Sequence, residues 1–220
     1  MNTQPNSLLR ALRALCGSIF IALLPGILLT VSSSALAEPE EELARATFAG
    51  GCFWCMEPPY DRLDGVIETI SGFSGGRVSN PSYQDVVRGG TGHREVVQVI
   101  YDPAIISYDE LLHVYWRNVD PLDDGGQFCD RGSAYRTAIF AHGPDQMRKA
   151  QDSLDKLNHS GRFDESIVTP VIEFERFYAA EEYHQDYYRN NPVRYRYYRW
   201  RCGRDARLTE LWGDEADEAP

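Results

Sequence analysis

The stretch Gly50-Gly51-Cys52-Phe53-Trp54-Cys55-Met56-Glu57 decides how this chain passes from its first strand into its first helix. An alternating run from Ala46 to Ala49 precedes it and predicts a strand that ends at the two glycines. Glycines permit a sharp turn where a side chain would clash. Cys52 then stands at the predicted start of a helix, where unpaired N–H groups and the helix dipole favour a thiolate. We therefore predict that the pKa of Cys52 falls from about 8.5 toward neutrality.

Two large aromatic side chains and a second thiol follow Cys52 directly. Phe53 and Trp54 offer an apolar clamp, and Cys55 lies three residues after Cys52. Together with the glycine turn, this arrangement predicts a nucleophile with a thiol partner. The alternative is a buried, inert cysteine packed beside core aromatic residues, which is typical of an arbitrary Cys-aromatic stretch.

The N-terminal residues resemble a targeting segment rather than part of the fold. Arg10 and Arg13 precede an apolar run from 14 to 31, and Ala35-Leu36-Ala37 follows it. This order predicts a secretory signal peptide over residues 1–37 and cleavage after Ala37. We expect export, to a periplasm, and no stable membrane association after cleavage. The alternative is an uncleaved N-terminal membrane anchor, since the apolar run reaches the minimum length of a span.

The charge of the chain limits the partners that it can have. The formal net charge is −11 at pH 7, and cleavage would make it more negative because segment 1–37 carries two arginines and no acidic residue. Such a balance argues against nucleic acid and anionic lipid as partners. The acidic residues that follow, 38–45, are expected to form a flexible N-terminus. We expect a monomer.

The remaining sequence predicts strands and helices mixed within one domain. This pattern favours an α+β two-layer sandwich with a mixed, mainly antiparallel sheet, a ferredoxin-like variant. We expect a catalytic domain over 46–192 and a C-terminal segment over 193–220. Pro58-Pro59 is expected to interrupt the first helix. The expected strands are 46–49, 65–70, 93–101, 135–141 and 167–174, and the expected helices are 52–63, 82–88, 107–116, 144–159, 179–190 and 208–212.

Four of the five cysteines remain after cleavage, which removes Cys16; they are Cys52, Cys55, Cys129 and Cys202. An exported protein can hold two structural disulfides. A domain of this size does not need such staples, so a redox cycle fits the cysteines at least as well. The five histidines lack the spacing of a zinc site, and His184 is expected on a polar helix face. We expect no metal, haem, flavin or nucleotide cofactor.

Several motifs, in order, resemble those of the A-class peptide methionine sulfoxide reductases. Gly51-Cys52-Phe53-Trp54 is similar to the signature of that family, and the resemblance extends over about 46–192. It implies that Cys52 is the nucleophile and that Tyr83, Glu95, Asp130 and Tyr135 line a sulfoxide pocket. The further motifs are Gly72-Phe73-Ser74-Gly75-Gly76, Asn80-Pro81-Ser82-Tyr83, Gly92-His93-Arg94-Glu95, Asp120-Pro121, Asp130-Arg131-Gly132 with Tyr135-Arg136, and Glu181-Glu182-Tyr183-His184-Gln185.

The residue types also suit sulfoxide reduction, which needs a soft nucleophile, an acid and an apolar slot for a methyl group. Cys52 supplies the nucleophile, and Phe53 with Trp54 the slot. Glu95 could hold a proton if burial raises its pKa. Tyr83 and Tyr135 could donate hydrogen bonds to the sulfoxide oxygen. Each assignment has an alternative: Glu95 as a surface partner of Arg94, the tyrosines as packing residues, and Asp130 as the cap of a turn.

The expected cycle leaves Cys52 as a sulfenic acid, which a second thiol converts to a disulfide. We prefer Cys202 as the resolving cysteine because a flexible tail could carry it to the pocket, and Cys55 is the alternative. Cys129 is expected to be a buried or spare thiol. A thioredoxin-like dithiol protein would then reduce the disulfide. The resemblance implies the S epimer of methionine sulfoxide, free or in proteins, as substrate, and repair of oxidised proteins as the role. A general thiol–disulfide oxidoreductase that uses Cys52 and Cys55 is the competing function.

Overall fold

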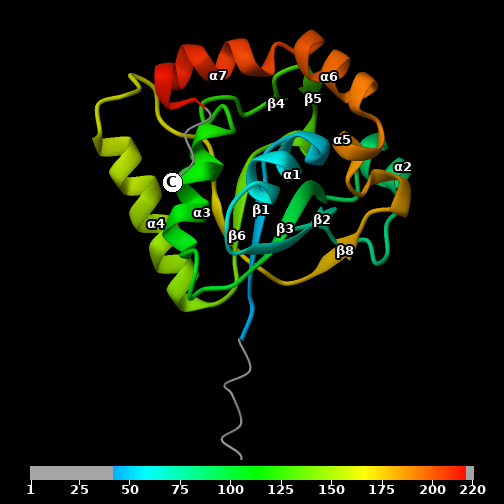
Figure 1. Ribbon diagram of the computed structural model, residues 1–220, viewed down its shortest axis with the longest axis horizontal. Helices are drawn as coiled ribbons and strands as arrows, with labels where there is room; N and C mark the ends of the chain where they lie inside the picture. Colours follow the sequence, from blue (N-terminus) through cyan, green and yellow to red (C-terminus); the bar gives the residue numbers. More distant parts are fainter. Residues whose placement is uncertain (1–41, 217–220) are drawn as a thin grey trace, which may run out of the picture. The chain divides into compact units, whose positions relative to one another are not determined.

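A six-stranded sheet forms the centre of the molecule in the computed structural model, which describes residues 42–216 (Figure 1). The strand order is β7-β6-β1-β3-β2-β8; β6 and β7 pair in parallel, and every other pair is antiparallel. The predicted α+β fold with a mixed, mainly antiparallel sheet is confirmed. The strands are β1 Ala44–Ala49, β2 Val66–Ser74, β3 Arg94–Tyr101, β6 Ala138–Ala141, β7 Val171–Glu173 and β8 Phe177–Ala179, and β4 Gly126–Gln127 with β5 Asp130–Arg131 forms a separate hairpin.

The helices surround this sheet, with α3 and α4 on one side and α6 and α7 running past the β4–β5 hairpin (Figure 1). Capping boxes begin two of these helices: Ser82 caps α2 with Asp85, and Ser107 caps α3 with Glu110. Among the described residues no helix is long and apolar enough to cross a membrane. The α-helices are α1 Phe53–Asp61, α2 Tyr83–Arg88, α3 Tyr108–Arg117, α4 Pro144–His159, α5 Tyr187–Asn190, α6 Pro192–Arg201 and α7 Arg204–Trp212, and the 3₁₀ turns are η1 Ser133–Tyr135, η2 Glu182–His184 and η3 Gly213–Glu215.

The strand register brings the first helix to the beginning of β3. Phe48 pairs with Val97, so the chain leaves β1 beside the first residues of β3. The ring of Phe48 stacks on Tyr115 at 5.2 Å, and the Tyr115 hydroxyl donates to the carbonyl of Ala49 at 2.8 Å. The main hydrophobic core therefore fixes the end of β1, immediately before the glycine turn.

The C-terminal segment belongs to the same core. Leu208, Leu211 and Trp212 of α7 are buried in the cluster that contains Phe48. Residues 193–216 are thus packed helices rather than a flexible tail. The chain beyond 216 and the predicted signal segment 1–37 lie outside the described residues.

Several expected elements differ from the structure. Strand β1 begins at Ala44, within the segment 38–45 that was expected to be flexible, and the strands expected over 135–141 and 167–174 are shortened to β6 and β7. Helix α1 continues through Pro58 and Pro59 to Asp61, although neither proline has an N–H to donate within the helix. Strand β2 extends to Ser74, where a loop was expected, because 72–74 pair with β8. The predicted helix over 179–190 is wrong, and the structure has β8, η2 and α5 there instead. Residues 177–179 form a strand because they pair with the edge of β2.

Candidate active site

Cys52 lies in a tight turn between β1 and α1, and the two preceding glycines are required there. A Cβ atom on Gly50 would lie 2.4 Å from the Met56 sulfur. Gly51 has φ +83°, and a Cβ on it would meet the Gln127 Cβ at 2.5 Å. Cys52 is the N-cap of α1, as predicted, and is 6% exposed. The turn thus places the Cys52 sulfur at the N-terminus of α1, in the interior of the protein.

The two thiols of the turn form a hydrogen-bonded pair. Burial raises the pKa of the Cys52 thiol well above its usual value, and its hydrogen bond with Cys55 and two nearby carboxyls act in the same direction. The same bond lowers the pKa of Cys55 to about 7, assisted by the charges of Arg204 and Arg199. The prediction of an acidic Cys52 thiol is therefore wrong in this arrangement, because burial outweighs the helix N-terminus.

Glu95 lies on β3 beside the turn and is 1% exposed. The backbone N–H of Phe53, next to Cys52, donates to Glu95 Oε2 at 3.1 Å. Burial raises the pKa of Glu95 to about 8, aided by the charges of Asp130 and Cys55, while the Phe53 N–H and Tyr135 oppose the rise. Glu95 is not a surface partner of Arg94. It holds a proton at neutral pH and can donate it.

Tyr83 and Tyr135 approach the same place from α2 and η1. Their side chains interact by a hydrogen bond, and Tyr135 also bonds the Glu95 carboxyl. Burial raises the pKa of Tyr83 to about 12 and that of Tyr135 well above its usual value. Both hydroxyls therefore keep their protons and are available as donors.

Phe53 and Trp54 form an aromatic wall whose orientation His184 helps to fix. The Trp54 ring stacks on Tyr187 at 3.7 Å, and its Nε1–H donates to His184 Nδ1 at 3.1 Å. The His184 ring lies 5.0 Å from Phe53 and 4.3 Å from Tyr83. His184 is 1% exposed, so the prediction of a polar helix face is wrong, because η2 turns this side chain inward.

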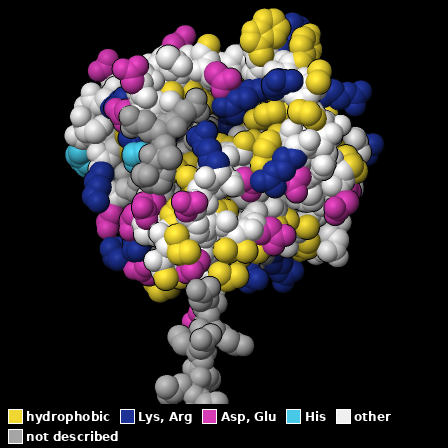
Figure 2. Space-filling view, in the orientation of Figure 1, with side chains coloured by type: hydrophobic (Ala, Val, Ile, Leu, Met, Phe, Trp, Pro, Cys, Tyr) yellow, Lys and Arg dark blue, Asp and Glu magenta, His cyan; other side chains and the backbone are white. Residues whose placement is uncertain are grey.

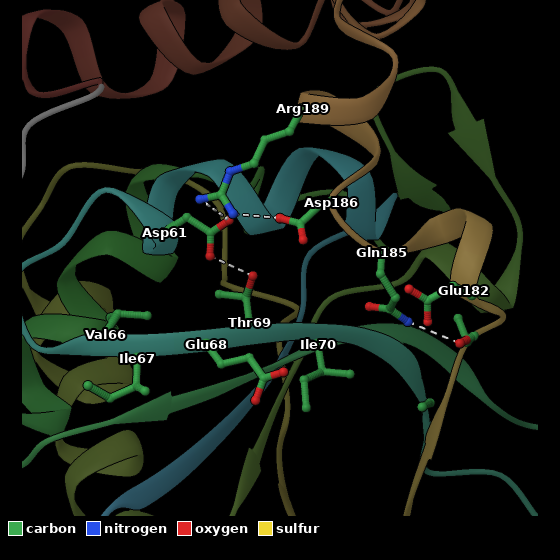
Figure 3. A pocket seen from close by; sticks show the side chains of 12 residues that line it. Asp61, Val66, Ile67, Glu68, Thr69, Ile70, Glu182, Gln185, Asp186 and Arg189 are labelled. Carbon is green, nitrogen blue, oxygen red and sulfur yellow. Dashed lines mark hydrogen bonds and ion pairs between the residues drawn. The ribbon is translucent and has the colours of Figure 1, made fainter.

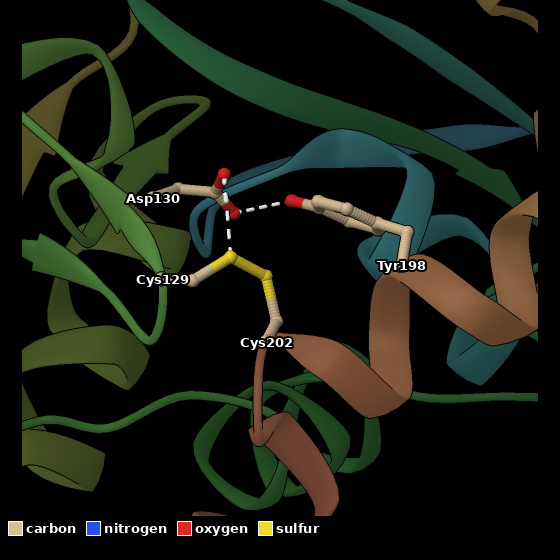
Figure 4. Close-up of a disulfide and its surroundings, with 4 residues drawn as sticks. All are labelled: Cys129, Asp130, Tyr198 and Cys202. Carbon is tan, nitrogen blue, oxygen red and sulfur yellow. Dashed lines mark hydrogen bonds between the residues drawn. A yellow bond between two sulfur atoms is a disulfide. The ribbon is translucent and has the colours of Figure 1, made fainter.

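Asp130 follows Cys129, and Cys129 forms a disulfide with Cys202 (Figure 4). The interpretation of Cys129 as a buried or spare thiol is therefore wrong: it is exposed and bonded. Cys202 ends α6 and is not carried by a flexible tail. Cys129, Asp130 and Cys202 also make up the one group of possible metal ligands found among residues 42–216, but its two sulfurs are already joined to each other.

Sequence reasoning missed Arg204, which stabilises the Cys52 turn through a hydrogen bond to the Gly50 carbonyl. Its side chain is 1% exposed, and its Nη2 donates to the carbonyls of Gly50 at 3.1 Å and Asn118 at 2.6 Å. The guanidinium also lies over the Phe128 ring, 4.5 Å from its centroid. Nothing near Arg204 in the sequence signalled this contact, since 154 residues separate it from Gly50.

A cavity of about 390 Å³ lies elsewhere, between β2 and the segment that carries η2 and α5 (Figure 3). None of the predicted catalytic residues lines it. Arg189 in its lining contacts Asp61 at 3.2 Å and Asp186 at 2.7 Å, and Thr69 donates to Asp61 at 2.7 Å. The reactive groups gather instead around the Cys52 turn, where the structure brings together all of the predicted pocket residues.

The chain resembles bacterial reductases along most of its length. The peptide methionine sulfoxide reductase MsrA of Bacillus licheniformis is 49% identical over 178 residues, which cover 81% of this chain and 98% of that protein. MsrA of Bacillus subtilis is 48% identical, and the match covers 76% of this chain and 95% of that protein. The MsrA/MsrB protein of Vibrio cholerae is 47% identical over 176 residues, which make up 47% of its own length.

Solved structures agree with this similarity. Mxr1 of Saccharomyces cerevisiae in its reduced form has a TM-score of 0.65 at 32% identity, and the match covers 70% of this chain and 88% of that one. Methionine sulfoxide reductase A of Corynebacterium diphtheriae has a TM-score of 0.64 at 31% identity, with 70% and 78% covered. The family model described as peptide methionine sulfoxide reductase matches residues 44–216. This chain belongs to the peptide methionine sulfoxide reductase family.

Proposed function

We propose that this enzyme reduces the S epimer of methionine sulfoxide, free or within proteins, and so repairs oxidised proteins. One observation carries the proposal: the N–H of Phe53, adjacent to Cys52, donates to Glu95 Oε2 at 3.1 Å. This contact sets a sulfur nucleophile beside a carboxyl whose pKa is about 8. Sulfoxide reduction needs that pair, because the departing oxygen must be protonated as the new bond to sulfur forms.

In the first step, Cys52 Sγ attacks the sulfoxide sulfur while Glu95 donates its proton to the sulfoxide oxygen. As the oxygen passes to Cys52, the S–O bond of the substrate and the bond just formed between the two sulfurs both break, leaving a Cys52 sulfenic acid and free methionine. The substrate sulfur gains two electrons and the cysteine sulfur loses two. Protonation of the sulfoxide oxygen makes the substrate sulfur more electrophilic, so the neutral Cys52 thiol can attack and lose its proton as it does so. The Glu95 carboxylate formed by the first proton transfer takes up this thiol proton.

The side chains around Cys52 fit the two other groups of a sulfoxide. The hydroxyls of Tyr83 and Tyr135 retain their protons and can donate hydrogen bonds to the oxygen, where negative charge develops. Phe53 and Trp54 provide the apolar surface for the methyl group. Asp130 completes this set, and its carboxylate favours the protonated form of Glu95.

The structure favours Cys55 over Cys202 as the resolving cysteine. Cys55 is hydrogen-bonded to Cys52 and has a pKa of about 7, whereas Cys202 is joined to Cys129. We propose that the Cys55 thiolate displaces hydroxide, as water, from the Cys52 sulfenic acid and forms the Cys52–Cys55 disulfide. A thioredoxin-like dithiol protein then reduces this disulfide and is itself oxidised by two electrons.

The test is turnover of each epimer of dansylated methionine sulfoxide by cysteine variants. We expect Cys52→Ser to lose all activity, Cys55→Ser to complete one turnover but not a second with a thioredoxin-like reductant, and Cys202→Ser to continue through many turnovers. Activity in Cys52→Ser would reject the proposed nucleophile. Arrest of Cys202→Ser after one turnover, with Cys55→Ser unaffected, would restore Cys202 as the resolving residue.

A general thiol–disulfide oxidoreductase is a second candidate, because the Cys52–Cys55 pair contains one thiol with a pKa of about 7. That function has no use for a protonated Glu95. Reduction of insulin disulfides, measured beside reduction of methionine sulfoxide, separates the two. We expect Glu95→Gln to suppress sulfoxide reduction while leaving any insulin reduction unchanged.

We further propose that the enzyme is exported as a monomer and works in the periplasm. The support is the basic, apolar and Ala-x-Ala order of residues 1–37, so this part of the proposal rests on sequence. Mass spectrometry of protein from the periplasmic fraction tests it. A mature N-terminus at Glu38 is expected, and an intact N-terminus in the membrane fraction would favour the anchor instead.

A further inference from the structure

Asp130 is held from two sides by the C-terminal part of the chain (Figure 4). The Tyr198 hydroxyl donates to Asp130 Oδ2, and the Cys129 sulfur lies 3.9 Å from Oδ1. Cys129 is bonded in turn to Cys202, whose Cα lies 4.8 Å from its own. Tyr198 and Cys202 are four residues apart on α6, so they lie one helical turn apart on the same face. The β4–β5 hairpin and helix α6 are therefore joined twice, once covalently through Cys129 and once by the Tyr198 hydrogen bond.

The junction between α6 and α7 is anchored to the Cys52 turn and to its aromatic wall. Arg204, two residues after Cys202, donates to the carbonyl of Gly50 at 3.1 Å. The Tyr198 ring meets the Trp54 ring edge-on, with centroids 5.8 Å apart. Tyr198 thus stands at a fixed place between the aromatic wall and Asp130, and its hydroxyl has a defined acceptor.

The position of Asp130 matters because its charge acts on the whole site. Burial raises the pKa of Asp130, while the Tyr198 hydrogen bond and the charge of Arg204 lower it. A carboxylate at this place disfavours ionisation of its neighbours. The groups whose pKa it raises are Cys52, Cys55, Tyr83, Glu95, Tyr135 and Tyr198.

We propose that Tyr198 is a positioning residue that holds Asp130 as a carboxylate beside Cys52 and Glu95, and that the Cys129–Cys202 disulfide keeps the two residues together. The proposal rests on the proposed function, since it assigns residues that serve the Cys52–Glu95 pair. The Cys129–Cys202 disulfide then has a structural role, which is to keep Asp130 next to Tyr198. Its sulfurs need not exchange with Cys52 or Cys55 during turnover.

The neighbouring Tyr197 provides a matched control. It lies on the outer face of α6 and is 61% exposed, with Val193 at 72% and Trp200 at 73%. Hydrophobic and basic side chains gather over this helix at the upper right of Figure 2. Tyr197→Phe removes a phenolic hydroxyl from the same helix but leaves the hydrogen bond between Tyr198 and Asp130 in place.

The measurement is the first-turnover rate of dansylated methionine sulfoxide reduction, with mass spectrometry confirming that Cys129–Cys202 is closed where it is present. We expect Tyr198→Phe to lower this rate about tenfold, which corresponds to about 1.4 kcal/mol. Tyr197→Phe should stay within about twofold of the parent. The double variant Cys129→Ser/Cys202→Ser should also lose rate in the first turnover, because without the disulfide the hairpin that carries Asp130 is no longer tied to α6.

Two further readouts distinguish positioning from general damage. A Tyr198→Phe/Asp130→Asn double variant should be no slower than Asp130→Asn alone, because Tyr198 acts through Asp130. Loss of the Tyr198 donor should raise the pKa of Asp130, so the acid side of the pH–rate profile should move toward neutral pH in Tyr198→Phe but not in Tyr197→Phe.

The proposal is overturned if Tyr198→Phe reduces sulfoxide at the parental rate, or if its loss adds in full to that of Asp130→Asn. A Cys129→Ser/Cys202→Ser protein with a normal first turnover that stalls afterwards would show that the disulfide transfers electrons instead. Failure of the proposed function is distinct, because the parent enzyme would then reduce no methionine sulfoxide or Cys52→Ser would remain active.

Discussion

Replacing Glu95 with Gln should lower activity and raise stability at the same time. Burial raises the pKa of Glu95 from 4.5 to about 8 in the folded protein, whereas the unfolded chain returns it to the ordinary value. Between these two values the folded protein holds a proton that the unfolded chain has lost. Folding stability therefore falls as pH rises from about 4.5 to about 8. Glutamine has a similar shape, no charge at any pH and no such slope.

The magnitude follows from the shift. At pH 7 the Glu95 carboxyl is about 2.5 pH units above its unfolded pKa, and each unit corresponds to about 1.4 kcal/mol, so the cost to the parent is about 3 kcal/mol. Glu95→Gln should thus match the parent near pH 4.5 and exceed its free energy of unfolding by about 3 kcal/mol at pH 7. Sulfoxide reduction should fall by about 10² to 10⁴, the usual contribution of a general acid.

Urea unfolding at pH 5 and pH 7, with dansylated methionine sulfoxide turnover on the same samples, measures both effects. Glu57→Gln is the control. Burial raises the pKa of Glu57 to about 7, and Ser71 donates to it at 2.8 Å, but it is not among the groups that shift the pKa of Cys52. Relative to the parent, this variant should become more stable as pH rises, and it should keep its activity. In the parent enzyme, kcat/KM should decline above about pH 8 as Glu95 ionises.

A stability difference between Glu95→Gln and the parent that is the same at pH 5 and pH 7 would refute the reasoning, because it would mean that Glu95 has the same pKa in both states. Parental activity in Glu95→Gln would remove its role as the acid. Equal losses of activity in Glu95→Gln and Glu57→Gln would point to general damage of α1 and its surroundings.

Three further substitutions test the turn and the aromatic wall. Gly51→Ala should lower the free energy of unfolding by about 2 kcal/mol in urea, because φ is positive there and the new Cβ would meet Gln127; a neutral result would show that the turn can relax. Arg204→Met should cost about 2–4 kcal/mol by leaving the Gly50 and Asn118 carbonyls unpaired, and should slow iodoacetamide labelling of Cys55 near pH 7, whose pKa the Arg204 charge lowers. His184→Phe should raise KM for methionine sulfoxide by about tenfold with little change in kcat, because Trp54 loses its acceptor; an unchanged KM would show that Tyr187 alone holds Trp54.

Sequence patterns predicted the elements that local rules determine. The helices expected over 82–88 and 107–116 are present as α2 and α3, and the strand expected over 93–101 is β3. The helix expected over 179–190 failed because pairing with β2 decided the state of 177–179. That hydrogen bonding comes from residues about a hundred positions away, and a local pattern contains no trace of it.

The site shows the same division between local and distant causes. Motifs named Cys52, Tyr83, Glu95, Asp130 and Tyr135, and the fold brings them together. The contacts that support them come from the C-terminal helices: Tyr198, Cys202 and Arg204 each reach a partner at least 68 residues away. No spacing rule connects residues so far apart, so the pairing of Cys129 with Cys202 could not be read from the sequence.

The error over Cys52 explains why the site needs an acid. A cysteine at a helix N-terminus is expected to ionise easily, and in an exposed turn that rule would decide its pKa. Here Cys52 is 6% exposed and faces Glu95 and Asp130, so burial and charge repulsion outweigh the helix. A thiol held neutral attacks poorly on its own, but the same burial and the same Asp130 charge keep Glu95 protonated. In the proposed mechanism, the features that suppress the thiolate therefore preserve the proton that the sulfoxide oxygen receives, and the reaction begins when a substrate links the two groups.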